Sequence, residues 1–148
     1  MQVLEIFQAK EGALYTTAPQ QSLAAAIDAM AEFDVGSLVV MEHGKMTGLL
    51  TFREVLVALK QKGMGANGVT VGDVMVKDPV TVFPEMEVND LRRLMIEKHS
   101  RYLPVMDGDT LLGVISFLDV AKAVLDEQSF ENQMLKSYIK NWPEDPQI

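Results

Sequence analysis

The sequence contains no cysteine. This absence excludes a disulfide framework, a thiolate metal site and a cysteine nucleophile. Lysine and arginine form no run, and the formal net charge is -8, which argues against nucleic acids and anionic membranes as main partners. The two histidines, His43 and His99, do not have the spacing of a zinc site, so we expect no bound metal.

Long apolar runs are missing as well. No stretch approaches the roughly 18 apolar residues of a membrane-spanning helix, and Glu5 interrupts the short apolar N-terminal segment, which predicts neither a transmembrane helix nor a signal peptide. The simplest expectation is a soluble cytoplasmic protein. The sequence also lacks a Walker loop, a G-x-G-x-x-G motif and a Ser-His-Asp arrangement, so we predict no enzymatic activity and no catalytic residues.

Most of the chain consists of two copies of one unit. An offset of 65 residues aligns residues 14–59 with residues 79–124 without a gap. Identical pairs include Gly48 with Gly113 and Phe52 with Phe117, and most other pairs keep their apolar or polar character. An alignment that keeps turns, helix starts and core positions together indicates an internal duplication.

Each copy has the same predicted order of elements: strand, helix, strand, strand, helix. The predicted elements are strands at 16–17 and 80–82, helices beginning at Ser22 and Glu87, strands at 37–41 and 102–106, hairpin turns, strands at 46–50 and 111–115, and helices from Phe52 and Phe117. A short helix is also expected over Val3–Ala9. The fold class is therefore α+β, with two β-α-β-β-α repeats and an additional C-terminal helix.

Glycines mark the boundary between the copies. Gly63, Gly65 and Gly68 indicate a linker. We place the first repeat with the N-terminal segment at residues 1–62, the linker at 63–70, the second repeat at 71–125, and a C-terminal helix and tail at 126–148.

The C-terminal segment has its own apolar pattern. Phe130, Met134 and Tyr138 recur every four residues, with Leu135 and Ile139 beside them. This stripe either packs against its own domain or docks on a second subunit. Residues 142–148 contain two prolines and are expected to form a loose tail.

The stretch from Gly113 to Asp119 carries the strongest site signal. A strand here delivers a hydroxyl, a carboxylate and a new helix N-terminus to one point, where a phosphate or a ribose could bind. Ser116 and Asp119 also form a capping-box pattern, and in the alternative interpretation they only cap the helix. Thr51 and Glu54 repeat the pattern in the first copy.

The two G-h-h-[ST]-x-x-[DE] signatures, at 48–54 and 113–119, resemble those of a tandem cystathionine β-synthase (CBS) domain pair of the small stand-alone bacterial type. The resemblance implies two repeats related by a pseudo-twofold axis, a homodimer, and a regulatory module without an enzyme domain. It also implies an adenosine-containing ligand such as AMP, ADP, ATP, S-adenosylmethionine or an NAD-type dinucleotide, no required cofactor, and an unknown regulated protein. The alternative is a ligand-free structural dimerisation module.

The resemblance further implies two clefts between the copies. The first cleft would be formed by Tyr15, Thr16, Ala18, Arg101, Tyr102, Pro104, Ser116 and Asp119. The second, weaker cleft would be formed by Ser37, Thr51, Glu54, Val80, Thr81 and Phe83. It has Glu54 in place of the commoner aspartate, and Gly36 stands where the first cleft has Arg101.

Overall fold

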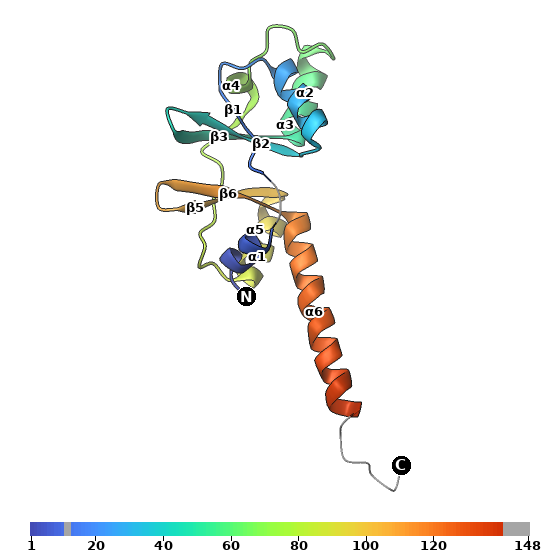
Figure 1. The fold of residues 1–148 in the computed structure, drawn as a ribbon. Coiled ribbons are helices and arrows are strands. Elements are labelled where there is room, and N and C mark those ends of the chain that lie inside the picture. The colour runs from blue at the N-terminus through green and yellow to red at the C-terminus, as the bar shows by residue number, and fades with distance from the viewer. Residues whose placement is uncertain (11–12, 141–148) are drawn as a thin grey trace, which may run out of the picture.

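The computed structural model describes residues 1–10 and 13–140, which form two packed units and a long terminal helix (Figure 1). The first unit contains β1 (Thr16–Thr17), α2 (Leu23–Phe33), β2 (Ser37–Glu42), β3 (Lys45–Thr51), α3 (Phe52–Lys62), α4 (Val71–Val74) and β4 (Val76–Lys77). The second contains α1 (Val3–Ala9), α5 (Val88–Lys98), β5 (Tyr102–Asp107), β6 (Thr110–Ser116) and α6 (Phe117–Lys140). In Figure 1 the sheets of the two units face each other, and most helices lie on the outer sides. The predicted α+β fold with two repeats is confirmed.

The two repeats form the same hairpin in the same register. β2 pairs antiparallel with β3, and β5 pairs antiparallel with β6. Each pair has a register irregularity at the aligned position, after Val40 in the first unit and after Val105 in the second. The helices that precede the hairpins, α2 and α5, both end on a residue in the left-handed conformation, Asp34 and His99. The structure thus preserves the 65-residue alignment down to its irregular positions.

The predicted strand at 80–82 is the main departure from this equivalence. β1 pairs in parallel with β2, and the N–H of Val39 donates to the carbonyl of Tyr15. In the second unit only an isolated bridge forms, between Val82 and Val105. The residue aligned with Val39 is Pro104, which has no N–H to donate, so the strand prediction was wrong at this point.

The segments that precede the repeats cross over to the other unit. The N–H of Val3, in α1, donates to the carbonyl of Met86 at 2.9 Å, and the N–H of Val71, in α4, donates to the carbonyl of Gln21 at the same distance. Both valines are fully buried. Each unit therefore completes its core with a helix that chain order assigns to the other repeat. The domain boundaries at residues 62, 70 and 125 stay predictions. They divide the chain in sequence, whereas α1 and α4 each pack in the unit on the other side of a boundary.

Two separate clusters of buried side chains result. The first is built from Leu23, Ala26, Met30, Leu38, Val40, Leu50, Val55, Ala58, Ala66, Val69 and Val71. The second is built from Val3, Ile6, Val82, Val88, Leu91, Met95, Leu103, Val105, Ile115 and Val120. Ala66 and Val69 belong to the predicted linker, so part of that linker is core in the folded chain.

The last helix of the second repeat continues without a break for 24 residues. Its far half leaves both units (Figure 1), and Phe130, Met134, Leu135 and Ile139 are all more than half exposed. The interpretation in which this stripe packs against its own domain is therefore wrong. The tail predicted at 142–148 lies outside the described residues. None of the described helices is long and apolar enough to cross a membrane.

Candidate functional site

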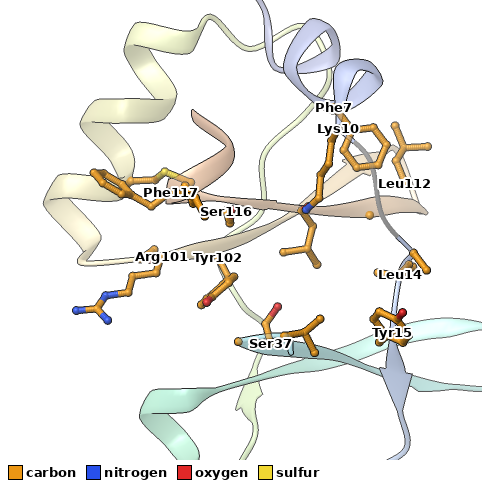
Figure 2. A pocket seen from close by; sticks show the side chains of 18 of the residues that line it. Phe7, Lys10, Leu14, Tyr15, Ser37, Arg101, Tyr102, Leu112, Ser116 and Phe117 are labelled. Atoms are coloured by element: carbon orange, nitrogen blue, oxygen red, sulfur yellow. The ribbon is translucent and has the colours of Figure 1, made fainter. Parts of the chain in front are cut away.

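A cavity of about 1020 Å³ lies between the two units. The first unit contributes Tyr15 and the segment 34–37. The second unit contributes the segments 99–102 and 112–118, together with Phe7 and Lys10 at the end of α1 (Figure 2). Both hairpins and the beginning of α6 meet here because the two sheets face each other. A ligand in this cavity would touch both repeats at once.

Half of the residues predicted for the first cleft line this cavity. Tyr15, Arg101, Tyr102 and Ser116 are among its walls. Thr16, Ala18 and Asp119 lie outside the lining set, although Asp119 bonds to residues within it. Pro104 is fully buried and packs away from the cavity surface.

The start of β2 belongs to the same cavity. Ser37, which was predicted for the second cleft, lines it together with Gly36. A Cβ atom at Gly36 would overlap the hydroxyl of Tyr102. The absence of a side chain at Gly36 thus makes room for the Tyr102 side chain from β5. Tyr102 and Ser37, which were predicted for separate clefts, line one cavity.

Ser116 and Asp119 form a reciprocal cap at the beginning of α6. The N–H of Ser116 donates to Oδ2 of Asp119 at 2.8 Å, and the N–H of Asp119 donates to Oγ of Ser116 at 3.0 Å. The same carboxylate oxygen also faces Nζ of Lys10 at 2.9 Å. The capping interpretation therefore holds, and it leaves Oδ1 of Asp119 as the oxygen that these contacts do not use.

Lys10 is the site residue that sequence reasoning missed. It lines the cavity, and its Nζ donates to the carbonyl of Val114 at 2.7 Å in addition to the ion pair with Asp119. Chain order places Lys10 in the first repeat, whereas α1 packs on the second. The only signal in the sequence is the equivalence of α1 and α4, which implies that the two segments occupy equivalent places in the fold.

The first-copy cap is closed more tightly on itself. Oε1 of Glu54 accepts from the N–H of Thr51 at 2.9 Å and from its hydroxyl at 2.7 Å. Neither residue lines the 1020 Å³ cavity, and Val80, Thr81 and Phe83 also lie outside its walls. A second cleft at these residues stays a prediction.

The cavity walls carry basic and aromatic side chains among a larger number of aliphatic ones. Lys10, His99 and Arg101 lie on the walls with the acidic Asp34, and within residues 1–10 and 13–140 Arg101 makes no ion pair. The rings of Phe7, Tyr15, Tyr102 and Phe117 also line the space. The ring of Tyr15 stacks on the ring of Phe33, with ring centroids 4.3 Å apart. Such a wall suits a ligand with a flat ring and a negatively charged group.

The described residues contain no group of three His, Cys, Asp or Glu side chains placed to hold a metal ion.

Comparison with protein families gives a match to the CBS domain over residues 13–61 and 71–126. These two ranges contain the two copies of the duplicated unit. A curated relative, the mitochondrial CBS domain-containing protein CBSX3 of Arabidopsis thaliana, is 32% identical over 120 residues. The match covers 78% of this chain but only 58% of the length of that relative.

Two solved structures are also similar. A putative signal-transduction protein with CBS domains from Burkholderia ambifaria has a TM-score of 0.79 and 30% identity, and the match covers 86% of this chain and 96% of that one. Arabidopsis CBSX2 in complex with AMP has a TM-score of 0.67 and 27% identity, with 78% of this chain and 90% of that chain covered.

Proposed function

This chain belongs to the CBS domain family, and we propose that it is a regulatory module that binds an adenosine-containing nucleotide in the cavity between its two repeats. The observation that carries the proposal is the 1020 Å³ cavity with Arg101 and Tyr102 on one wall and Ser116 at a helix N-terminus on another. The AMP complex of the similar CBSX2 supports this class of ligand. AMP, ADP, ATP, S-adenosylmethionine and NAD-type dinucleotides are the candidates.

Each part of such a ligand has a matching group on the cavity wall or directly beside it. Arg101 would bind a phosphate through paired N–H donors. Tyr102 and Phe117 would lie against the base, and Oδ1 of Asp119 would accept a ribose hydroxyl. No residue is assigned a catalytic role, and the module is proposed to act without enzymatic activity or a required cofactor.

Signalling would follow from the position of the cavity. A ligand that contacts both repeats stabilises the arrangement of the two units that fits it best, and a partner can detect that arrangement. We propose a homodimer in the cytoplasm, with an unidentified regulated protein as the further partner.

The alternative function is a ligand-free dimerisation module. The exposed apolar residues in the far half of α6 favour it, because they need a covering surface whether or not a nucleotide binds. The two functions differ in one measurable property, the binding of nucleotide.

Isothermal titration calorimetry with AMP, ATP, NADH and S-adenosylmethionine tests the proposal. At about 100 times its dissociation constant, a ligand should raise the free energy of unfolding by about 2.7 kcal/mol. Arg101→Gln should weaken the binding of phosphorylated ligands, whereas Arg53→Gln, on the exposed surface of α3 and outside the cavity, should not. If no ligand binds at millimolar concentration, the ligand-free alternative is favoured.

A further inference from the structure

The far part of α6 carries large apolar side chains that no other described segment covers. Contact between α6 and the second core involves Val120, Ala123 and Val124, near the beginning of the helix. Glu127, Gln128 and Glu131 still border a small groove with Met1 and Arg92 of the second unit, and beyond them the helix extends away from both units (Figure 1). Leu125 is nevertheless 62% exposed, and Ile139, near the end of the helix, is 64% exposed. Such a helix needs a partner along its apolar side.

One set of side chains on α6 follows a seven-residue repeat. We define the seam as Ala121, Leu125, Gln128, Asn132, Leu135 and Ile139. Its members are separated alternately by three and four residues, the spacing that faces a partner helix in a coiled coil. At about 100° per residue, the seam lies about 100° around the helix from the mean direction of Val120, Ala123 and Val124, so it does not face its own core.

We propose that the seam packs against the seam of a second copy, and that the two α6 helices form a parallel, in-register, two-stranded coiled coil. This inference rests on the proposed homodimer and assigns it a surface. It does not depend on whether the cavity binds a nucleotide.

The polar members of the seam favour two parallel strands. In a parallel register Asn132 lies opposite its own counterpart in the second copy, and so does Gln128. An asparagine at this kind of seam position fixes register and favours a dimer, at some cost in stability. Leu125, Leu135 and Ile139 form apolar layers on either side.

The charges beside the seam decide the direction. Glu131 flanks the seam on one side and Lys136 flanks it on the other, five residues later. This is the offset at which opposite charges meet between two parallel helices. An antiparallel pair that matched Asn132 with Gln128 would instead place Lys122 near Lys136 of the other copy and Glu131 near its own counterpart. Only the parallel arrangement brings opposite charges together.

The same helix provides a matched control for the proposal. Met134 belongs to the other apolar stripe, which follows Phe130 at every fourth residue and lies on a different side of the helix. Met134 and Leu135 are adjacent in sequence and are each 57% exposed. A glutamate at either position adds the same charge, but only position 135 is in the seam.

Sedimentation equilibrium of the full chain tests the surface. The unmodified chain should be a dimer, Leu135→Glu should raise its dissociation constant by at least about tenfold, and Met134→Glu should leave it unchanged. Equal effects of the two variants, a monomeric unmodified chain, or an assembly larger than a dimer would each overturn the proposal. Both positions are distant from the cores, and unfolding in urea checks that each variant is folded.

Oxidative cross-linking tests the direction, since the natural chain has no cysteine. Ile139→Cys should give a disulfide-linked dimer, because a parallel pair places the two 139 positions side by side. In the antiparallel arrangement they would be about 27 Å apart along the helix axis. Ser137→Cys, on the outer side of the helix, should cross-link poorly. Absence of a selective cross-link at 139 would contradict the parallel register.

Calorimetry with AMP or ATP on Leu135→Glu separates this inference from the proposed function. Retained nucleotide binding by a dissociated variant would support both. If Leu135→Glu weakens the dimer selectively and neither the unmodified chain nor any variant binds nucleotide, the coiled coil is supported and the proposed nucleotide binding is rejected.

Discussion

The two caps at the beginnings of α3 and α6 share a sequence pattern but use their carboxylates differently. Glu54 accepts both the N–H and the hydroxyl of Thr51 through one oxygen. Asp119 accepts the N–H of Ser116 and the ammonium of Lys10, while the hydroxyl of Ser116 acts as an acceptor. One cap is closed on its own residues, and the other is connected to a cation that lines the cavity.

The length of the side chain accounts for this difference. The additional methylene of glutamate lets Glu54 fold back onto the hydroxyl of Thr51, 2.7 Å away. The shorter Asp119 meets the backbone of Ser116 and leaves the hydroxyl proton of Ser116 available for another acceptor. The same sequence motif therefore forms two different hydrogen-bond arrangements, and in the described part of the chain only the carboxylate of the second copy contacts a residue of the cavity wall outside its own cap.

The largest expected effect concerns these two carboxylates. Asp119→Asn should weaken nucleotide binding by roughly 10-fold to 100-fold, because a hydrogen bond to a charged group contributes about 1.5–3 kcal/mol. Glu54→Gln should leave the affinity for the cavity unchanged. Calorimetry on both variants provides the comparison. Equal losses would mean that the two caps contribute alike.

The two aligned glycines, Gly48 and Gly113, should differ in their tolerance of a side chain. A Cβ atom at Gly48 would lie 2.8 Å from the carbonyl oxygen of Val76, whose backbone is held in β4, so Gly48→Ala should cost about 1–3 kcal/mol. At Gly113 it would overlap the end of the Phe7 ring, and the backbone there has a φ of +159°, which residues with a side chain rarely adopt. Gly113→Ala should therefore cost more than Gly48→Ala in the free energy of unfolding, measured in urea. The reverse order would contradict the strain described at Gly113.

Lys10 gives the second cap a cation that the first cap does not have. Lys10→Met should remove the ammonium that neutralises the Asp119 carboxylate, which makes this carboxylate a stronger acceptor for ribose, and should remove a positive charge from the cavity. Adenosine should then bind more tightly and ATP more weakly, each by up to about fivefold, since ion pairs of this partly exposed kind contribute about 1 kcal/mol or less. Lys45→Met, at the exposed beginning of β3 and outside the cavity, is the control. A change of the same sign for both ligands would exclude the competition between Lys10 and ribose for Asp119.

The repeats, their hairpins and the reciprocal cap of Ser116 with Asp119 were predictable, because each depends on residues close together in sequence. The prediction of a strand at 80–82 was wrong because its pairing depends on whether a residue distant in sequence, Pro104, has a backbone N–H to donate. Lys10 was missed because its position follows from α1 crossing to the second unit. Ser37 was placed in another cleft because sequence does not show that the beginnings of β2 and β5 meet in one cavity.

The two crossing segments also differ in their caps, and this leads to the smallest expected effect. Asp73 accepts from the N–H of Thr70 at 2.9 Å and caps α4, whereas the matching bond in α1, from the N–H of Gln2 to Glu5, is 3.3 Å long. The backbone hydrogen bond from Thr70, and then its hydroxyl, lower the pKa of Asp73 below its ordinary value of 3.8.

Because the folded-state pKa of Asp73 is lowered, its stabilising contribution is present above pH 3.8 and is lost as the pH falls through the folded value. Asp73→Asn should therefore lower the free energy of unfolding slightly at neutral pH, and the difference from the unmodified chain should shrink below pH 3.8. Thr70→Val keeps the backbone N–H, which is the larger cause, so it should retain most of this pH dependence. Urea unfolding between neutral and strongly acidic pH measures both variants. A difference for Asp73→Asn that does not change with pH would mean that the cap of α4 acts through shape and not through charge.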